Sequence, residues 1–325
     1  MAKRYARELG ILVLLIVLCV IVQSKSPVFL GVENLTNMAR RVGMYGIFGI
    51  GAAIVIITGG IDLSVGSMFA LLGVLLAMAL TEWRWNPILA VVGVLGLGSF
   101  LGIIHGFLVD KMRLQPFVVT LCGLLIYRGL AQFIAKDETK GFAEAKGFEG
   151  LRSFATGSPF GIPIQFILLV IIAIMFSVIL NRTVYGRSLF AVGSNEEAAR
   201  YSGIETGKVV ISAYVISGFL AAITAILLAF YTNSISPSSH GNSYELYGIA
   251  AAVLGGCSLR GGEGSILGVI LGTILLQVLQ NLVTLLGIKS SLNFAVVGTV
   301  ILIGVIADRL LSGRNFRIKG FRRAA

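Results

Sequence analysis

The feature that most constrains this chain is a succession of ten apolar runs separated by polar or Gly-rich segments. They fall at about 9–23, 42–58, 67–80, 88–108, 117–135, 164–180, 209–231, 244–257, 265–286 and 292–307. A helix needs ~20 apolar residues to cross ~30 Å of hydrocarbon, whereas a membrane strand needs only about ten. The runs therefore predict an all-α polytopic membrane protein with about ten transmembrane helices in a single domain over residues 1–325.

The composition agrees with a membrane location. Hydrophobic residues make up 56% of the chain and charged residues 13%, and the mean hydropathy is +0.93. We attribute the net charge of +11 to Lys and Arg residues that set the orientation in the membrane and attract anionic lipid, and we expect no nucleic-acid partner. The three cysteines lie in apolar runs without ligand-like spacing, so we interpret them as packing residues and expect no metal site.

Charge distribution predicts the orientation. If the N-terminus is cytosolic, 16 of the 26 Lys and Arg residues fall on the cytosolic side and nine on the other, with Arg128 inside a run. This bias favours cytosolic N- and C-termini. The pair Arg40-Arg41 fits poorly, which indicates that the edge of the second run is misplaced. On the outer side, the mixed-charge loop at about 136–163 is either a solvated connector or a docking surface for an external partner.

Two runs, 67–80 and 244–257, have only about 14 residues each. Short or Gly-interrupted runs are typical of the discontinuous helices of transporters, so we expect some of the spans to be short or broken. The span count depends on whether these two segments cross the membrane or re-enter it.

The sequences around these two short runs are weakly similar to each other. Tyr45-Gly46-Ile47 leads to Gly59-Gly60, and Tyr247-Gly248-Ile249 leads to Gly255-Gly256. Both units run in the same predicted direction. This similarity indicates either a parallel internal repeat or a chance match in Gly-rich sequence.

The polar stretch at about 181–208 lies between two apolar runs and contains one short predicted helix. Ser194 and Glu197 have the spacing of a capping box, and Gly203 stands where a left-handed C-terminal cap is expected. The helix would make about two turns, roughly 12 Å long. The residues that form it are Ser194, Asn195, Glu196, Glu197, Ala198, Ala199, Arg200 and Gly203. A cytosolic helix that is connected at both ends to membrane spans is suited to transmitting a movement of a soluble partner to those spans.

Polar residues inside or beside the apolar runs are candidates for a path through the membrane. They are Asp62, Ser64, Gln115, Gln277, Gln280 and Asn281. An acid at membrane depth is costly unless it is satisfied, so Asp62 is a functional candidate, although it or Ser64 can equally cap the helix that begins near Ser67. Gln115 either lines the path or occupies a cap or lipid interface. The polar stripe of the ninth run either binds sugar hydroxyls or joins helices through hydrogen bonds.

Several function classes find no support. The chain has no G-x-x-x-x-G-K-[ST] phosphate loop, because Gly207-Lys208 is preceded by Ser202 and followed by Val209 at the decisive positions. With two histidines and no triad or zinc spacing, we expect no enzyme and no cofactor bound by this chain. Few charges lie in the runs, so an ion-coupled carrier is also disfavoured.

Taken together, these segments resemble the permeases of ABC importers, in particular the ribose/xylose/arabinose type. Glu197-Ala198-Ala199 followed by Gly203 matches the first half of the E-A-A-x-x-x-G coupling signature, although Ala213 stands where that signature has Ile and no Leu-Pro follows. The run 59–67, Tyr185-Gly186-Arg187-Ser188, and the glycines of 254–262 complete the likeness over nearly the whole chain.

The resemblance implies a non-catalytic subunit in the bacterial inner membrane that forms the path for a monosaccharide, a pentose such as ribose being the first expectation. It implies two permease subunits, identical or paralogous, two cytosolic ATPase subunits that bind ATP and Mg, and a periplasmic sugar-binding protein. Glu196, Glu197 and Arg200 would then contact the ATPase, and Asp62 and Ser64 would brace the inner end of the path. The alternatives are a permease for branched-chain amino acids or for a sugar-like signal, and a stand-alone secondary carrier.

Overall fold

The structure, a computed structural model, describes residues 2–142 and 147–287 and, beyond these, residues 292, 295, 298, 299 and 302. The described helices are α1 (Ala2–Lys25), α2 (Val32–Ile57), α3 (Val65–Thr81), α4 (Pro87–Asp110), α5 (Pro116–Ala135), α6 (Glu149–Thr156), α7 (Ile164–Arg182), α8 (Val184–Ser194), α9 (Glu196–Tyr201), α10 (Thr206–Thr232), α11 (Tyr244–Leu254) and α12 (Ile266–Leu285). A 3₁₀ turn, η1, spans Pro159–Gly161. The fold is all-α apart from one short ribbon.

Nine of the ten predicted runs correspond to described helices, and the tenth, 292–307, lies largely outside the described residues. Seven helices, α1, α2, α4, α5, α7, α10 and α12, are long and apolar enough to cross a membrane. Helices α3 and α11 are shorter, as the two short runs predicted. The polytopic helical class is therefore confirmed.

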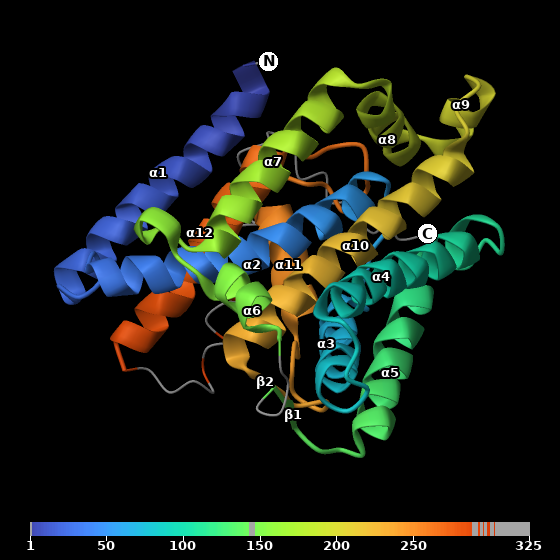
Figure 1. Cartoon of the computed structure of the whole chain (residues 1–325). Helices are drawn as coiled ribbons and strands as arrows, with labels where there is room; N and C mark the ends of the chain where they lie inside the picture. The colour runs from blue at the N-terminus through green and yellow to red at the C-terminus, as the bar shows by residue number, and fades with distance from the viewer. Residues whose placement is uncertain are drawn as a thin grey trace, which may run out of the picture.

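Helices α2 and α10 form the centre of the bundle (Figure 1). Helix α2 packs against α7, α10, α11 and α12, and α10 packs against α2, α3 and α4. Small residues allow the closest approaches, because a Cβ on Gly102 or Gly106 of α4 would overlap the backbone of α10. Helices α1, α4, α5 and α7 lie at the periphery and expose apolar side chains, as expected of surfaces that meet lipid or another membrane subunit.

The two ends of the bundle differ. At one, called here the α9 end, lie α8 and α9 together with the end of α2 and the start of α10 (Figure 1). At the other, the ribbon end, β1 (Lys140–Gly141) pairs antiparallel with β2 (Ser234–Ile235) beside α6. Lys140 lies opposite Ile235, so the ribbon joins the loop after α5 to the end of α10.

The second helix begins at Val32, ten residues before the predicted run, so the predicted edge was wrong. Arg40 lies inside α2, where its guanidinium donates to Ser158 Oγ at 3.4 Å and stands 5.2 Å from the centre of the Tyr231 ring. These partners lie at the ribbon end and explain how a helix carrying an Arg-Arg pair extends beyond its apolar stretch.

Candidate functional site

The predicted short helix is α9, but its cap differs from the prediction. Asn195 occupies the N-cap, and its Oδ1 accepts from the Ala198 amide at 2.9 Å. Ser194 instead ends α8, and its hydroxyl donates to the Phe190 carbonyl at 2.8 Å. The capping box assigned to Ser194 and Glu197 was therefore wrong, because α8 continues one residue further and moves the cap to Asn195.

The C-terminal cap at Gly203 is confirmed. Gly203 has a left-handed backbone with φ of +84°. Its amide donates to the Arg200 carbonyl at 3.0 Å, and the Ile204 amide donates to the Ala199 carbonyl at 3.1 Å. These two bonds form a Schellman motif, which closes the helix and turns the chain back toward α10.

The residues of α9 divide into an inner and an outer set. Glu196 Oε1 accepts from Arg113 at 3.0 Å, from Arg200 on the next turn and from the Thr206 hydroxyl at 3.4 Å, so Glu196 and Arg200 bind their own chain. Ala199 is buried, whereas Glu197 and Ala198 are exposed. Tyr201 is 91% exposed and was missed by the sequence analysis, although an aromatic residue in a polar helix is itself a signal of an interface.

A hollow of about 570 Å³ lies next to α9. Its walls come from the end of α4 and the turn between α9 and α10, including Asp110, Arg113, Arg200 and Glu205. Asp110 lies at the start of α10, so close that a Cβ on Gly207 would overlap its carboxylate. A carboxylate is stabilised at a helix N-terminus, so this contact fixes the end of α4 to the start of α10.

Four glycines join α9 to the rest of the α9 end, and we call them the glycine junction: Gly59, Gly193, Gly261 and Gly262. The Gly262 amide donates to the Ile57 carbonyl at 2.9 Å. A Cβ on Gly193 would overlap that same carbonyl, and a Cβ on Gly261 would lie 2.6 Å from the Gly193 carbonyl oxygen. Three segments thus meet through backbone atoms at Gly193, shortly before α9 begins at Glu196.

The chain between α2 and α3, Thr58–Ser64, is called here the first break. Asp62 is 3% exposed, and its carboxylate accepts three hydrogen bonds. Oδ1 accepts from the Ser64 amide at 3.0 Å and the Ser64 hydroxyl at 2.6 Å, and Oδ2 accepts from Ser217 of α10 at 2.8 Å. Asp62 therefore forms a turn with Ser64 and attaches it to α10. Helix α3 begins at Val65, and neither side chain caps it in the predicted way.

The network continues into α4 and α5. His105 Nδ1 lies 3.5 Å from Ser64 Oγ, and its Nε2 lies 2.9 Å from the Tyr127 hydroxyl. The Ile61 carbonyl accepts from Thr120 at 3.2 Å and from Tyr214 at 3.3 Å. His105 therefore connects Ser64 of the first break to Tyr127 of α5. Helices α4, α5 and α10 all hold the first break.

The other predicted path residues lie apart from Asp62. Asn281 exchanges two amide hydrogen bonds with Asn34 of α2, at 2.7 and 3.1 Å, which favours the helix-joining interpretation. Gln277 is 2% exposed, and neither of its amide atoms has a hydrogen-bond partner in the described part of the chain. Gln280 lies near Tyr247, and Gln115 is exposed at the N-cap of α5 without a side-chain cap bond.

Arg128 and Glu245 form a second charged region, which the sequence analysis did not connect with the first break. Arg128 of α5 donates to the carbonyls of Pro237 and His240 at 3.0 and 2.8 Å. Glu245 is buried, and its carboxylate lies where a Cβ on Gly66 would stand. The segment before α11 thus packs against the first turn of α3.

Comparisons with known proteins agree with this architecture. A family model described as "branched-chain amino acid transport system / permease component" matches residues 34–305. The ribose import permease protein of Escherichia coli (strain K12) is 37% identical over 308 residues, which cover 94% of this chain and 95% of that protein.

Two further relatives are similar over comparable lengths. The ribose import permease protein of Bacillus subtilis (strain 168) is 38% identical over 304 residues, or 93% of each chain. The L-arabinose transport system permease protein of Escherichia coli (strain K12) is 35% identical over 306 residues, covering 93% of this chain and 90% of that protein. The chain therefore belongs to this family of membrane permease components of transport systems.

Proposed function

We propose that this chain is the transmembrane subunit of an ATP-driven importer in the bacterial inner membrane and forms the path for a monosaccharide, with ribose the first candidate. The observation that carries the proposal is the exposed, doubly capped helix α9, whose base meets the end of α2 through the glycine junction. Relatives named as ribose and arabinose permeases support a sugar over an amino acid.

The partners follow from this role. Two cytosolic ATPase subunits bind ATP and Mg and perform the hydrolysis, so this chain itself is not an enzyme and binds no cofactor. A second permease subunit completes the path, and a periplasmic sugar-binding protein delivers the substrate. Glu197, Ala198 and Tyr201 form the exposed surface for the ATPase, because they point away from the bundle. Glu196 holds α9 in position by accepting hydrogen bonds from Arg113 and Thr206, and Arg200 binds the same carboxylate.

Motion reaches the membrane through the glycine junction. Gly193 contacts the Ile57 carbonyl, and the first break begins immediately after Ile57. A backbone contact without intervening side chains transmits a displacement with little loss, because close-packed atoms cannot be compressed. Asp62 and Ser64 then brace the first break against α4, α5 and α10, so that a shift of α9 changes the packing of these three helices together.

Gln277 and Gln280 are the side chains we assign to the path. Both amide atoms of Gln277 and Nε2 of Gln280 are buried without a hydrogen-bond partner among the described residues, which costs about 1–3 kcal/mol for each group, and a hydroxylated substrate would supply donors and acceptors for them. A neutral lining suits an uncharged sugar. Asn281 instead joins α12 to α2.

The test is uptake of labelled ribose by the reconstituted complex of permease, ATPase and binding protein. Glu197→Lys is expected to lower uptake and the stimulation of ATPase activity at least about tenfold, which corresponds to ~1.4 kcal/mol of lost coupling. Glu33→Lys is the matched control, because Glu33 is also an exposed acid but lies in the first turn of α2. It should leave both activities unchanged.

Three results would contradict the proposal in different ways. Uptake without any ATPase would contradict the importer assignment. Equal stimulation in Glu197→Lys and the unchanged protein would remove the coupling role of α9. Uptake of labelled leucine, with none of labelled ribose or arabinose, would replace the sugar by a branched-chain amino acid, the substrate class named in the family description.

A further inference from the structure

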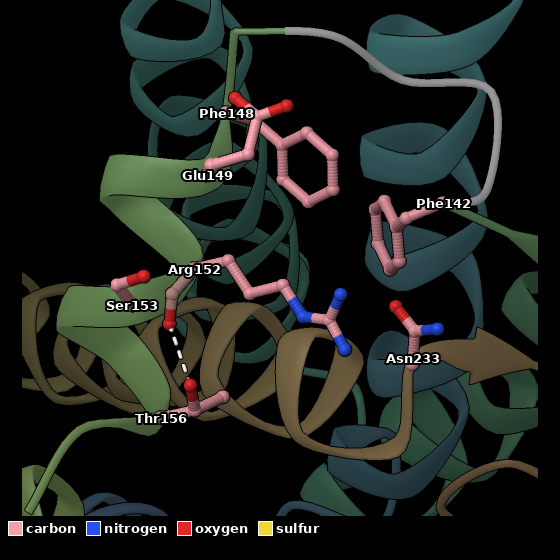
Figure 2. A pocket seen from close by; sticks show the side chains of 7 residues that line it. All are labelled: Phe142, Phe148, Glu149, Arg152, Ser153, Thr156 and Asn233. Atoms are coloured by element: carbon pink, nitrogen blue, oxygen red, sulfur yellow. Dashed lines mark hydrogen bonds between the residues drawn. The ribbon is translucent and has the colours of Figure 1, made fainter.

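The ribbon end carries a hollow of about 500 Å³ that the transport path does not use. Phe142 and Phe148 line it (Figure 2). Both rings are buried against Phe230 of α10, at 5.4 and 5.9 Å between ring centres, and this packing makes that side of the hollow rigid. Residues 142 and 148 of the loop at 136–163 are therefore packed onto the bundle. A rigid surface is what a docking site requires and what a solvated connector lacks.

One wall of the hollow is the polar face of α6. Glu149, Arg152, Ser153 and Thr156 line the hollow from one helix, and Arg152 is the side chain that extends into it, while Ala155 turns into the core. The helix is fixed in place, since Gln165 of α7 donates to the Ala155 carbonyl at 2.8 Å. The Thr156 hydroxyl donates to the Arg152 carbonyl, also at 2.8 Å.

Arg152 extends across the hollow toward Asn233, which lies on the opposite wall (Figure 2). Asn233 ends α10 in a left-handed conformation with φ of +57°, and its amide donates to the Ala229 carbonyl. Among the described residues the Arg152 guanidinium has no ion pair and donates no hydrogen bond. The Glu149 carboxylate lies at the rim and points away from it (Figure 2).

A nearby cation behaves differently. Lys140 in β1 binds Glu82 at 3.1 Å and Glu138 at 3.4 Å, and the hydrogen bond to Glu82 raises the pKa of Lys140 above its ordinary value. The positive charge of Lys140 is thus already neutralised by two carboxylates of the same chain. Arg152 offers a planar set of N–H donors, with the Asn233 amide beside it, and this combination fits a carboxylate held by two parallel hydrogen bonds.

We propose that this hollow is a docking pocket for an acidic side chain of the extracytoplasmic binding protein, held by Arg152 and Asn233. This inference rests on the proposed function, which supplies such a partner at the ribbon end. An uncharged sugar would not require the cation. The surroundings suit a protein partner, because Phe160 is fully exposed next to α6 and Arg40 stacks on Tyr231, both residue types that are enriched at interfaces.

The test uses the complete permease–ATPase complex in nanodiscs of neutral lipid, titrated with fluorescent binding protein. Arg152→Glu is expected to weaken docking at least about tenfold while the basal ATPase activity stays unchanged. Arg84→Glu is the matched control, since Arg84 is an exposed cation in the loop between α3 and α4. It should change the affinity less than about twofold.

Two further variants keep the inference independent of a folding defect. Asn233→Gly removes the amide but tolerates the left-handed backbone, so a smaller loss, about threefold, is expected. Charge reversal of single acidic residues on the binding protein, scanned against Arg152→Glu, should restore affinity at one position. Such a rescue identifies the docked side chain and cannot come from general destabilisation.

Each outcome supports or overturns the pocket. Unchanged affinity of Arg152→Glu, or an equal loss in Arg84→Glu, would overturn it. Acetate that stabilises the complex through Arg152, with docking unaffected, would make the hollow a small-anion site instead. If the binding protein fails to stimulate even the unchanged complex, the proposed function fails; if it stimulates Arg152→Glu as well as the unchanged complex, only the pocket fails.

Discussion

The two breaks in the bundle, Thr58–Ser64 between α2 and α3 and Gly255–Ser265 between α11 and α12, begin in the same way and end differently. In each, a left-handed glycine closes the preceding helix: Gly59 with φ of +84° and Gly256 with φ of +93°. The next residue in each, Gly60 or Cys257, donates back to the carbonyl five residues earlier, at 3.0 and 2.9 Å. Both helices therefore end in a Schellman motif.

After the shared cap the two breaks diverge. The first is held by side chains, with Asp62 accepting from α10 and from Ser64. The second is held by backbone, through Gly261 and Gly262 in the glycine junction. Similar glycine caps therefore lead to different structures: a polar network inside the bundle after α2, and a backbone contact at the α9 end after α11. The residues that follow each cap determine which of the two forms.

The largest effect is expected from the side chain that holds the first break. Asp62→Leu leaves the Ser64 amide and the Ser64 and Ser217 hydroxyls without their acceptor, and each buried unsatisfied group costs about 1–3 kcal/mol. We expect a large drop in the thermal midpoint of the purified protein and loss of uptake, with a smaller drop for Asp62→Asn. Glu263→Leu in the second break, where the acid is exposed, should be neutral; equal losses at both positions would remove the distinction.

A somewhat smaller effect is expected at the glycine junction. Gly193→Ala places a methyl group against the Ile57 carbonyl, and overpacking of this kind costs about 1–3 kcal/mol. We expect the sugar transported per ATP hydrolysed to fall while basal hydrolysis persists. Gly129→Ala is the control, since a Cβ there has open space. Normal coupling in Gly193→Ala would show that α9 acts on the membrane by another route.

The smallest effect is expected at the start of α12. Ser265 accepts from the Gly268 amide at 3.4 Å and donates to Glu8 at 2.6 Å, so Ser265→Ala removes a cap worth about 1 kcal/mol. The thermal midpoint should fall by a few degrees while uptake stays normal. Ser64→Ala, at the corresponding position before α3, should reduce uptake as well, because Ser64 contributes to the Asp62 network. Identical behaviour of the two serines would contradict the assignment of different roles.

The sequence predicted what local patterns determine. The apolar runs predicted nine of the described helices, and Gly203 was correctly expected to close α9. The cap at Ser194 was wrong, because local spacing cannot tell whether a preceding helix extends by one residue. The start of α2 was also wrong, since the partners of Arg40, Ser158 and Tyr231, lie far from it in the chain.

The sequence named single candidate residues for the path, but not the connections between them. Asp62 was chosen because an acid is costly at membrane depth and Ser64 as a neighbouring candidate, whereas their links to Ser217 and His105 depend on the packing of α4 and α10. The hollow at the ribbon end lay beyond prediction for the same reason. Its walls, α6 and Asn233 at the end of α10, are distant in the chain and come together only in the folded bundle.

The ion pair between Glu196 and Arg113 has a consequence for the direction of movement. It ties α9 to the loop that precedes α5, while Gly193 ties the same region to the end of α2. Helix α2 leads directly into the first break, and α5 holds the Ile61 carbonyl of that break through Thr120. A rotation of α9 is therefore expected to pull on one side of the break and push on the other, which shears the segment and does not carry it along as a rigid unit.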